Sequence, residues 1–110
     1  MLPTKNRLDL ARQFRHFKNS PHVIESPYFR MVYRAASSEP KFGFVVTSKT
    51  GGAVQRNRAR RLMREMVRLR LDQLPPIEAV FIGRRRLTEA HLEEVLASFD
   101  KALSKISLSR

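Results

Sequence analysis

Residues 56–70 read RNRARRLMREMVRLR and combine a strongly basic composition with apolar residues at helical spacing. At about 100° per residue, one side of the predicted helix collects the apolar residues Ala59, Leu62, Met63, Met66 and Leu69. The opposite side collects the polar residues Asn57, Arg60, Arg61, Arg64 and Arg68. The segment therefore constrains the fold twice, because one face must cover a core while the other keeps its guanidinium groups at the surface.

This basic face has too few acidic neighbours for an ordinary surface helix. The segment holds seven arginines and a single acid, Glu65, whereas surface helices usually gain support from opposite charges three or four residues apart. The planar fork of a guanidinium matches the oxygens of a phosphate group. A partner that supplies negative charge therefore explains the face better than a structural role alone does.

The composition favours a small folded domain with an anionic partner. The chain has 110 residues, which predicts one domain over residues 1–110, and 42% of them are hydrophobic, enough for a core. The formal net charge of +12 favours nucleic acid or an anionic membrane surface as the partner. No apolar run approaches the roughly 18–20 residues of a membrane span, and the N-terminal residues lack the apolar core of a signal peptide. We therefore expect a cytoplasmic protein that does not enter a membrane.

Hydrophobic patterns predict the order α-β-β-α-β-α, an α+β two-layer sandwich of helices on a small mixed sheet. The predicted strands cover residues 22–35, 41–48 and 77–83. The predicted helices are residues 5–18, the basic helix from about Val54 to the proline pair 75–76, and a last helix. Thr88 is expected to cap that last helix, with Leu87 and Leu92 as a hydrophobic staple.

No group of residues in the sequence has the spacing of a catalytic or metal site. His16, His22 and His91 are scattered, without HExxH-like spacing, and the chain has no cysteine. The ten acidic residues lie mostly on predicted helices or turns, and they do not cluster at the end of a core strand as acid–base or metal-dependent nuclease chemistry requires. We therefore predict that the protein itself contributes no catalytic residue and no metal site.

Two features have both a structural and a functional interpretation. The Gly51-Gly52 turn precedes the basic helix, where backbone N–H groups favour an anion, yet a plain strand-to-helix turn explains the same residues. Phe14, Phe17, Phe29 and Tyr33 have the spacing of core residues. Basic residues are interleaved with these aromatic residues, as in grooves where unpaired bases stack on aromatic rings. Both pairs of alternatives stay open at this point.

The segment SKTGGAVQRNRARRLMRE resembles the protein subunit of bacterial ribonuclease P. The family pattern is a strand that ends in Ser-Lys, a glycine turn, Ala-Val, Arg-Asn-Arg, a basic pair and Arg-Glu. The matching residues are Ser48, Lys49, Gly51, Ala53, Val54, Arg56, Asn57, Arg58, Arg60, Arg61, Arg64 and Glu65. Further similarity at residues 6–8, 17–18 and 81–84 extends the resemblance over nearly the whole chain.

The resemblance implies that a large RNA carries the active centre, holds most of the Mg²⁺, and removes the 5′ leader of precursor transfer RNA. The basic helix is then expected to contact that catalytic RNA through Lys49, Arg56, Asn57, Arg58, Arg60, Arg61, Arg64 and Arg68. A groove between the first helix and the sheet is expected to hold the single-stranded leader through Phe14, Arg15, Phe17, Lys18, Phe29 and Tyr33. The family fold also includes an unusual left-handed βαβ crossover.

The sequence therefore favours a non-catalytic protein cofactor of ribonuclease P, with ribonuclease P RNA and precursor transfer RNA as partners. A basic ribosomal protein, or another structural RNA-binding protein, would share the charge but have no role in cleavage. A DNA-binding protein would place the basic helix in the major groove. The basic face argues against DNA, because apart from Asn57 it lacks the Asn, Gln or Ser variety that is typical of base readout.

Overall fold

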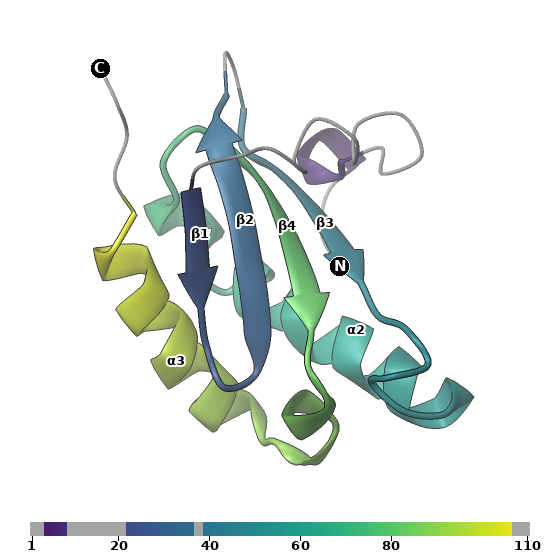
Figure 1. Cartoon of the computed structure of the whole chain (residues 1–110). Helices are drawn as coiled ribbons and strands as arrows, with labels where there is room; N and C mark the ends of the chain where they lie inside the picture. The colour runs from purple at the N-terminus through teal and green to yellow at the C-terminus, as the bar shows by residue number, and fades with distance from the viewer. Residues whose placement is uncertain (1–3, 9–21, 37–38, 107–110) are drawn as a thin grey trace.

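A computed structural model describes residues 4–8, 22–36 and 39–106 of the chain. Its elements are the short 3-10 helix η1 (Thr4–Asn6), strands β1 (His22–Glu25), β2 (Phe29–Ala35) and β3 (Lys41–Val45), helix α2 (Ala53–Arg68), the 3-10 helix η3 (Leu71–Gln73), strand β4 (Ile77–Gly83), the 3-10 helix η4 (Arg85–Glu89) and helix α3 (Leu92–Ser104). The four strands form one mixed sheet, and α2 and α3 lie together on one side of it (Figure 1). The predicted α+β class is confirmed.

The strands are ordered β1-β2-β4-β3 across the sheet. β2 pairs antiparallel with both β1 and β4, whereas β3 runs parallel to β4 and is joined to it through α2. In Figure 1, β3 and β4 both point downward, β4 lies to the left of β3, and α2 passes behind them. This arrangement makes the crossover left-handed, against the general right-handed rule.

Phe81 lies at the centre of the core between the sheet and the helices. Its ring centroid is 5.5 Å from that of Phe29 and 5.6 Å from that of Phe99, both in edge-on arrangements, and 5.8 Å from the stacked ring of Phe44. Aromatic pairs in these geometries add to the free energy gained from burial itself. The rings therefore join β2, β3, β4 and α3 around one point.

The opposite face of the sheet has no long helix among the described residues. Val32 and Val80 form a small apolar cluster there, and Leu8 packs on them from the N-terminal segment. The backbone N–H of Leu8 donates to the carbonyl of Phe42 at 2.8 Å, which holds this segment against β3. Because side chains alternate along a strand, the residues two positions before and after Val32, Arg30 and Arg34, share this face.

The structure corrects two of the predicted N-terminal elements. The first residues of the predicted helix 5–18 form the end of η1 and a bridge from Arg7 to β3, and residues 9–18 lie outside the described ranges. The predicted strand 22–35 is a hairpin of β1 and β2 instead. Its turn contains Pro27, and a proline cannot donate to the ladder of an uninterrupted strand.

Three other element ends differ from the prediction. β3 stops at Val45 rather than at residue 48, and α2 ends at Arg68, followed by η3, before the proline pair is reached. Thr88 does not cap α3, because it lies within η4 and its hydroxyl donates to the carbonyl of Arg85 at 2.8 Å. His91 takes the capping place instead, and its backbone N–H donates to the Glu94 carboxylate at 3.0 Å.

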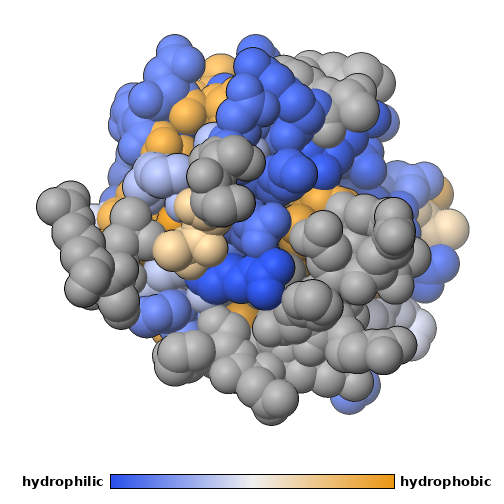
Figure 2. All heavy atoms as spheres, turned by 90° about the horizontal axis from the view of Figure 1, so that it is seen from above, coloured by the Kyte–Doolittle hydropathy of each residue, from blue (hydrophilic) through white to orange (hydrophobic). Residues whose placement is uncertain are grey.

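Among the coloured atoms of the view from above, hydrophilic ones predominate (Figure 2). Hydrophobic atoms show there as smaller patches between and beside the polar side chains. Within the described residues, no helix has the length and apolar character needed to cross a membrane.

Candidate nucleic-acid interface

The glycine turn sets the start of α2. Gly51 has φ of 150°, a value that side chains rarely allow, and a Cβ atom there would meet the Cβ of Gln55 at 2.9 Å. Gln55 folds back over the turn, and its Oε1 accepts the backbone N–H of Gly52 at 2.6 Å. This N–H is therefore already used within the protein, which favours the plain strand-to-helix turn over a phosphate contact at Gly52.

The inner face of α2 follows the predicted stripe with one exchange. Ala59, Met63 and Met66 are buried, and Leu62 packs against the core from its edge. Leu69 was predicted on the same face, but 39% of it is exposed, and Val67 is buried instead. The reason is that Leu69 is the C-cap residue, beyond the last helical turn, so the helical spacing no longer fixes its direction.

The outer face of α2 brings four of the predicted RNA-binding residues together. Asn57, Arg60, Arg61 and Arg64, together with Glu65, line a shallow hollow of about 580 Å³. Arg60 Nη1 donates to Asn57 Oδ1 at 2.9 Å, so these two side chains hold each other in place. Three guanidinium groups around one hollow make a surface suited to anionic oxygens.

Charge compensation is uneven along α2. Arg68 donates twice to the Glu65 carboxylate, at 2.9 and 2.6 Å, which lowers the pKa of Glu65 and raises that of Arg68. Within residues 4–8, 22–36 and 39–106, Arg60, Arg61 and Arg64 have no carboxylate within ion-pair distance. Around the hollow, Arg60, Arg61 and Arg64 are therefore the arginines without an ion pair among the described residues, and the charge of Arg68 is compensated more than the sequence suggested.

Two of the predicted arginines lie outside the hollow and contact backbone carbonyls. Arg58 Nη2 donates to the carbonyl of Ala90 at 2.8 Å, which ties α2 to the segment before α3. Arg56 Nη1 approaches the carbonyl of Gly51 at 3.4 Å, beside the glycine turn. Both side chains are half-buried, so each also has a contact within the protein.

Phe29 and Tyr33 lie in the core on the helix side of the sheet. Phe29 is fully buried against Phe81 and Phe99, and only 3% of Tyr33 is exposed, with its ring stacked on His22 at 5.1 Å between centroids. In this structure neither ring offers a face to a base, so the geometry does not support their predicted place in a groove. The alternative interpretation of these two aromatic residues, as core residues, is the one that the structure supports.

The remaining residues of the expected leader groove are Phe14, Arg15, Phe17 and Lys18, and all four lie outside the described residues. The sheet face opposite α2 and α3 is described, and it carries Arg30, Val32 and Ile82.

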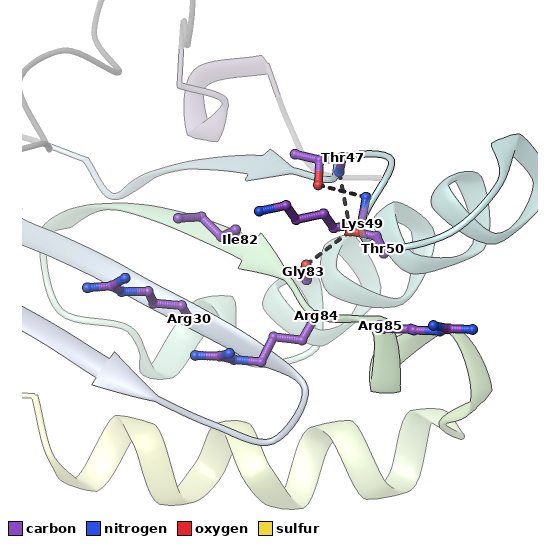
Figure 3. A pocket seen from close by; sticks show the side chains of 8 residues that line it. All are labelled: Arg30, Thr47, Lys49, Thr50, Ile82, Gly83, Arg84 and Arg85. Carbon is purple, nitrogen blue, oxygen red and sulfur yellow. Dashed lines mark hydrogen bonds between the residues drawn. The ribbon is translucent and has the colours of Figure 1, made fainter.

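A second basic pocket, of about 350 Å³, lies where β4 ends, and Lys49 belongs to it rather than to the hollow on α2. Its floor is held by the buried Thr50, whose hydroxyl donates to the carbonyl of Gly83 at 3.1 Å and accepts the backbone N–H of Thr47 at 3.2 Å. Figure 3 shows these bonds tying the loop after β3 to the end of β4. The loop that carries Lys49 is thereby fixed to the sheet.

Cations from three separate segments line this pocket. Arg30 comes from β2, Lys49 from the loop after β3, and Arg84 and Arg85 from the residues that follow β4, where η4 begins. The charged ends of Arg30, Lys49 and Arg84 lie toward one side of the pocket, whereas Arg85 points the other way (Figure 3).

The sequence interpretation did not include the three arginines of this pocket among the site residues. Strand alternation was the available signal for Arg30, since it places Arg30 on the face opposite Phe29 and Met31. The basic run after β4 was the signal for Arg84 and Arg85.

Comparisons with known proteins identify the family to which this sequence and fold belong. The family model described as Ribonuclease P matches residues 2–107. The ribonuclease P protein component of Nitratiruptor sp. is 32% identical over 99 residues, covering 90% of each chain, and that of Acidothermus cellulolyticus is 30% identical over 115 residues, covering 100% of this chain and 95% of the relative. The solved RNase P protein from Thermotoga maritima superposes with a TM-score of 0.82 at 26% identity, covering 92% of this chain and 97% of that one. With a basic helix, a left-handed crossover and matches of this extent, the chain belongs to the ribonuclease P protein family.

Proposed function

We propose that this protein is the RNA-binding, non-catalytic subunit of a ribonuclease P that removes the 5′ leader of precursor transfer RNA, with the catalytic centre in its RNA partner. The observation that carries the proposal is the group of three arginines on α2 that form no ion pair within the described part of the chain, in a chain of this family. A purely structural helix would gain from acids at these places, because neighbouring like charges destabilise it. A bound polyanion removes that repulsion.

The α2 hollow is the proposed contact with the catalytic RNA. Arg60, Arg61 and Arg64 can each donate two parallel hydrogen bonds to a phosphate, and Asn57 adds an amide beside them. Contacts of this kind follow the backbone and shape of a folded RNA rather than its sequence. The protein thereby lowers the repulsion between catalytic RNA and substrate RNA, which are both polyanions.

The pocket at the end of β4 is the proposed contact with the leader. Arg30, Lys49 and Arg84 surround it, and the half-buried Ile82 adds an apolar side chain to its lining. A groove with cations for the backbone and apolar surface for the bases suits a single strand without strict sequence preference. Phe17 and Lys18, which follow the family pattern, are proposed to complete this groove from the N-terminal segment, with Phe14 and Arg15 beside them.

The proposal places Mg²⁺ on the RNA partner rather than on this protein. Among the described residues, no three His, Asp or Glu side chains come close enough together to hold a metal ion. Mg²⁺ prefers carboxylate or phosphate oxygens in an octahedral arrangement. We propose that phosphates of the RNA partner supply them, and that the complex works in the cytoplasm.

Replacement of Phe17 by alanine is expected to weaken the binding of precursor transfer RNA and to leave the binding of mature transfer RNA nearly unchanged. A base stacked on an aromatic ring contributes about 1–3 kcal/mol, and only the precursor carries the leader. The measurement is the ratio of the two affinities in the complex reconstituted with ribonuclease P RNA.

This ratio also separates the proposal from its rival. A structural RNA-binding protein would bind precursor and mature transfer RNA equally, with or without Phe17. If both affinities fall together in the variant, Phe17 acts through the fold, and the leader groove lies elsewhere.

A further inference from the structure

Glu25 lies beside the pocket at the end of β4 and contacts two of the arginines that line it, Arg30 and Arg84. Its Oε2 accepts Arg84 Nη2 at 2.8 Å, and its Oε1 is 3.6 Å from Arg30 Nε. The backbone brings these three residues together. Glu25 and Arg30 are direct partners in the β1–β2 ladder, and the N–H of Arg84 donates to the carbonyl of Tyr28 at 2.9 Å.

The three cations on this side of the pocket therefore differ in how far a nearby carboxylate compensates their charge. Arg30 and Arg84 share one carboxylate, whereas Lys49 makes no ion pair within the described part of the chain. The contacts with Glu25 use Nε of Arg30 and Nη2 of Arg84, which leaves the other guanidinium nitrogens of each arginine for a ligand. A phosphate in the pocket would meet these donors with the carboxylate close behind them.

We propose that Glu25 determines the specificity of the leader site, because its carboxylate weakens the hold of Arg30 and Arg84 on RNA phosphates. The inference rests on the proposed leader-binding function. With Glu25 in place, the pocket alone adds little binding free energy for a free single strand. A precursor that the catalytic RNA already holds needs less from the pocket and still occupies it. Specificity is gained here by a repulsive element as well as by attractive ones.

The opposite role, in which Glu25 improves binding by orienting the two arginines, predicts a change of the opposite sign. The ion pairs are exposed, with 58% of the Glu25 side chain accessible and 43% and 51% for Arg84 and Arg30. Exposed pairs contribute little to fixing side chains. A negative charge beside a phosphate, by contrast, is repulsive in every geometry, so the repulsion determines the sign.

The test uses the full-length chain and a fluorescent single-stranded oligouridylate, with affinities measured over a range of salt concentrations. Glu25→Gln is expected to bind the oligonucleotide roughly three- to tenfold more tightly. The salt slope is expected to steepen by up to about 0.7 for each arginine released to a phosphate. Glu39→Gln is the matched control, because it removes a similarly exposed carboxylate, one that pairs with Lys5 before β3 begins. Its affinity should be close to that of the wild type.

A second comparison repeats Glu25→Gln in a chain that also carries Arg30→Gln and Arg84→Gln. There the substitution is expected to have no effect, since the two arginines it acts through are gone. Weaker or unchanged binding by Glu25→Gln, an equal gain in Glu39→Gln, or a gain that persists without the two arginines would overturn the inference. Tighter oligonucleotide binding that follows the expected pattern, in a complex that does not prefer precursor over mature transfer RNA, would support the role of Glu25 and reject the leader function.

Discussion

Replacing Arg60 and Arg64 with alanine is expected to weaken the binding of ribonuclease P RNA by about 100-fold or more. Both residues line the hollow on α2 and have no carboxylate partner among the described residues. A charge-assisted hydrogen bond contributes about 1.5–3 kcal/mol, so removing two costs about 3 kcal/mol or more. The salt dependence of the affinity should also become flatter, by about 0.7–0.9 of a slope unit for each RNA phosphate that the variant no longer binds.

The matched control for this pair is the double replacement of Lys101 and Lys105 with alanine. Both lysines are exposed at the end of α3, and their removal changes the net charge by the same amount. The control should retain most of its affinity and nearly the whole salt slope. An equal decrease in both double variants would mean that only net charge matters and that α2 is not the contact surface.

Phe29→Ala is expected to lower the free energy of unfolding by about 3–5 kcal/mol. The ring is fully buried against Phe81 and Phe99, and its removal leaves a cavity between the sheet and α3. Such a decrease is a large share of the roughly 5–15 kcal/mol that stabilises a small domain. Urea denaturation followed by circular dichroism measures it directly.

Val54→Ala provides the comparison for Phe29→Ala. Val54 is 81% exposed at the start of α2, so its truncation should change stability by no more than about 0.5 kcal/mol. If Phe29→Ala were as stable as the wild type and impaired only precursor binding, Phe29 would be a groove residue after all.

The basic helix was predictable because its periodicity is long and its two faces differ strongly. A helix of this length repeats its pattern several times, so Ala59, Met63 and Met66 identified the inner face without tertiary information. Strand β4 was predicted with both ends correct, since a continuous apolar run between a proline pair and a basic run leaves little choice.

The hairpin and the direction of the aromatic residues were not predictable from alternation alone. Alternation places Phe29 and Tyr33 on one face of a strand and Val32 on the other, but it does not say which face the helices cover. Here they cover the aromatic face. The apolar character of Val32 and Val80 on the other face made the two faces look alike.

The pocket at the end of β4 depends on the order of strands in the sheet. Arg30, Lys49 and Arg84 meet because β4 lies between β2 and β3, an order that requires the crossover through α2. No local pattern encodes this order. The pairing of Arg84 with Glu25 is hidden for the same reason, because the two residues are far apart along the chain.

The most direct test of the proposed function is a single-turnover cleavage assay on precursor transfer RNA at low Mg²⁺. Its three reactions contain ribonuclease P RNA alone, this protein alone, and the two together. The complex is expected to cut at the mature 5′ end much faster than the RNA alone, and the protein alone is expected to cut nothing. Specific cleavage by repurified, RNA-free protein, or a complex no faster than its RNA, would contradict the account.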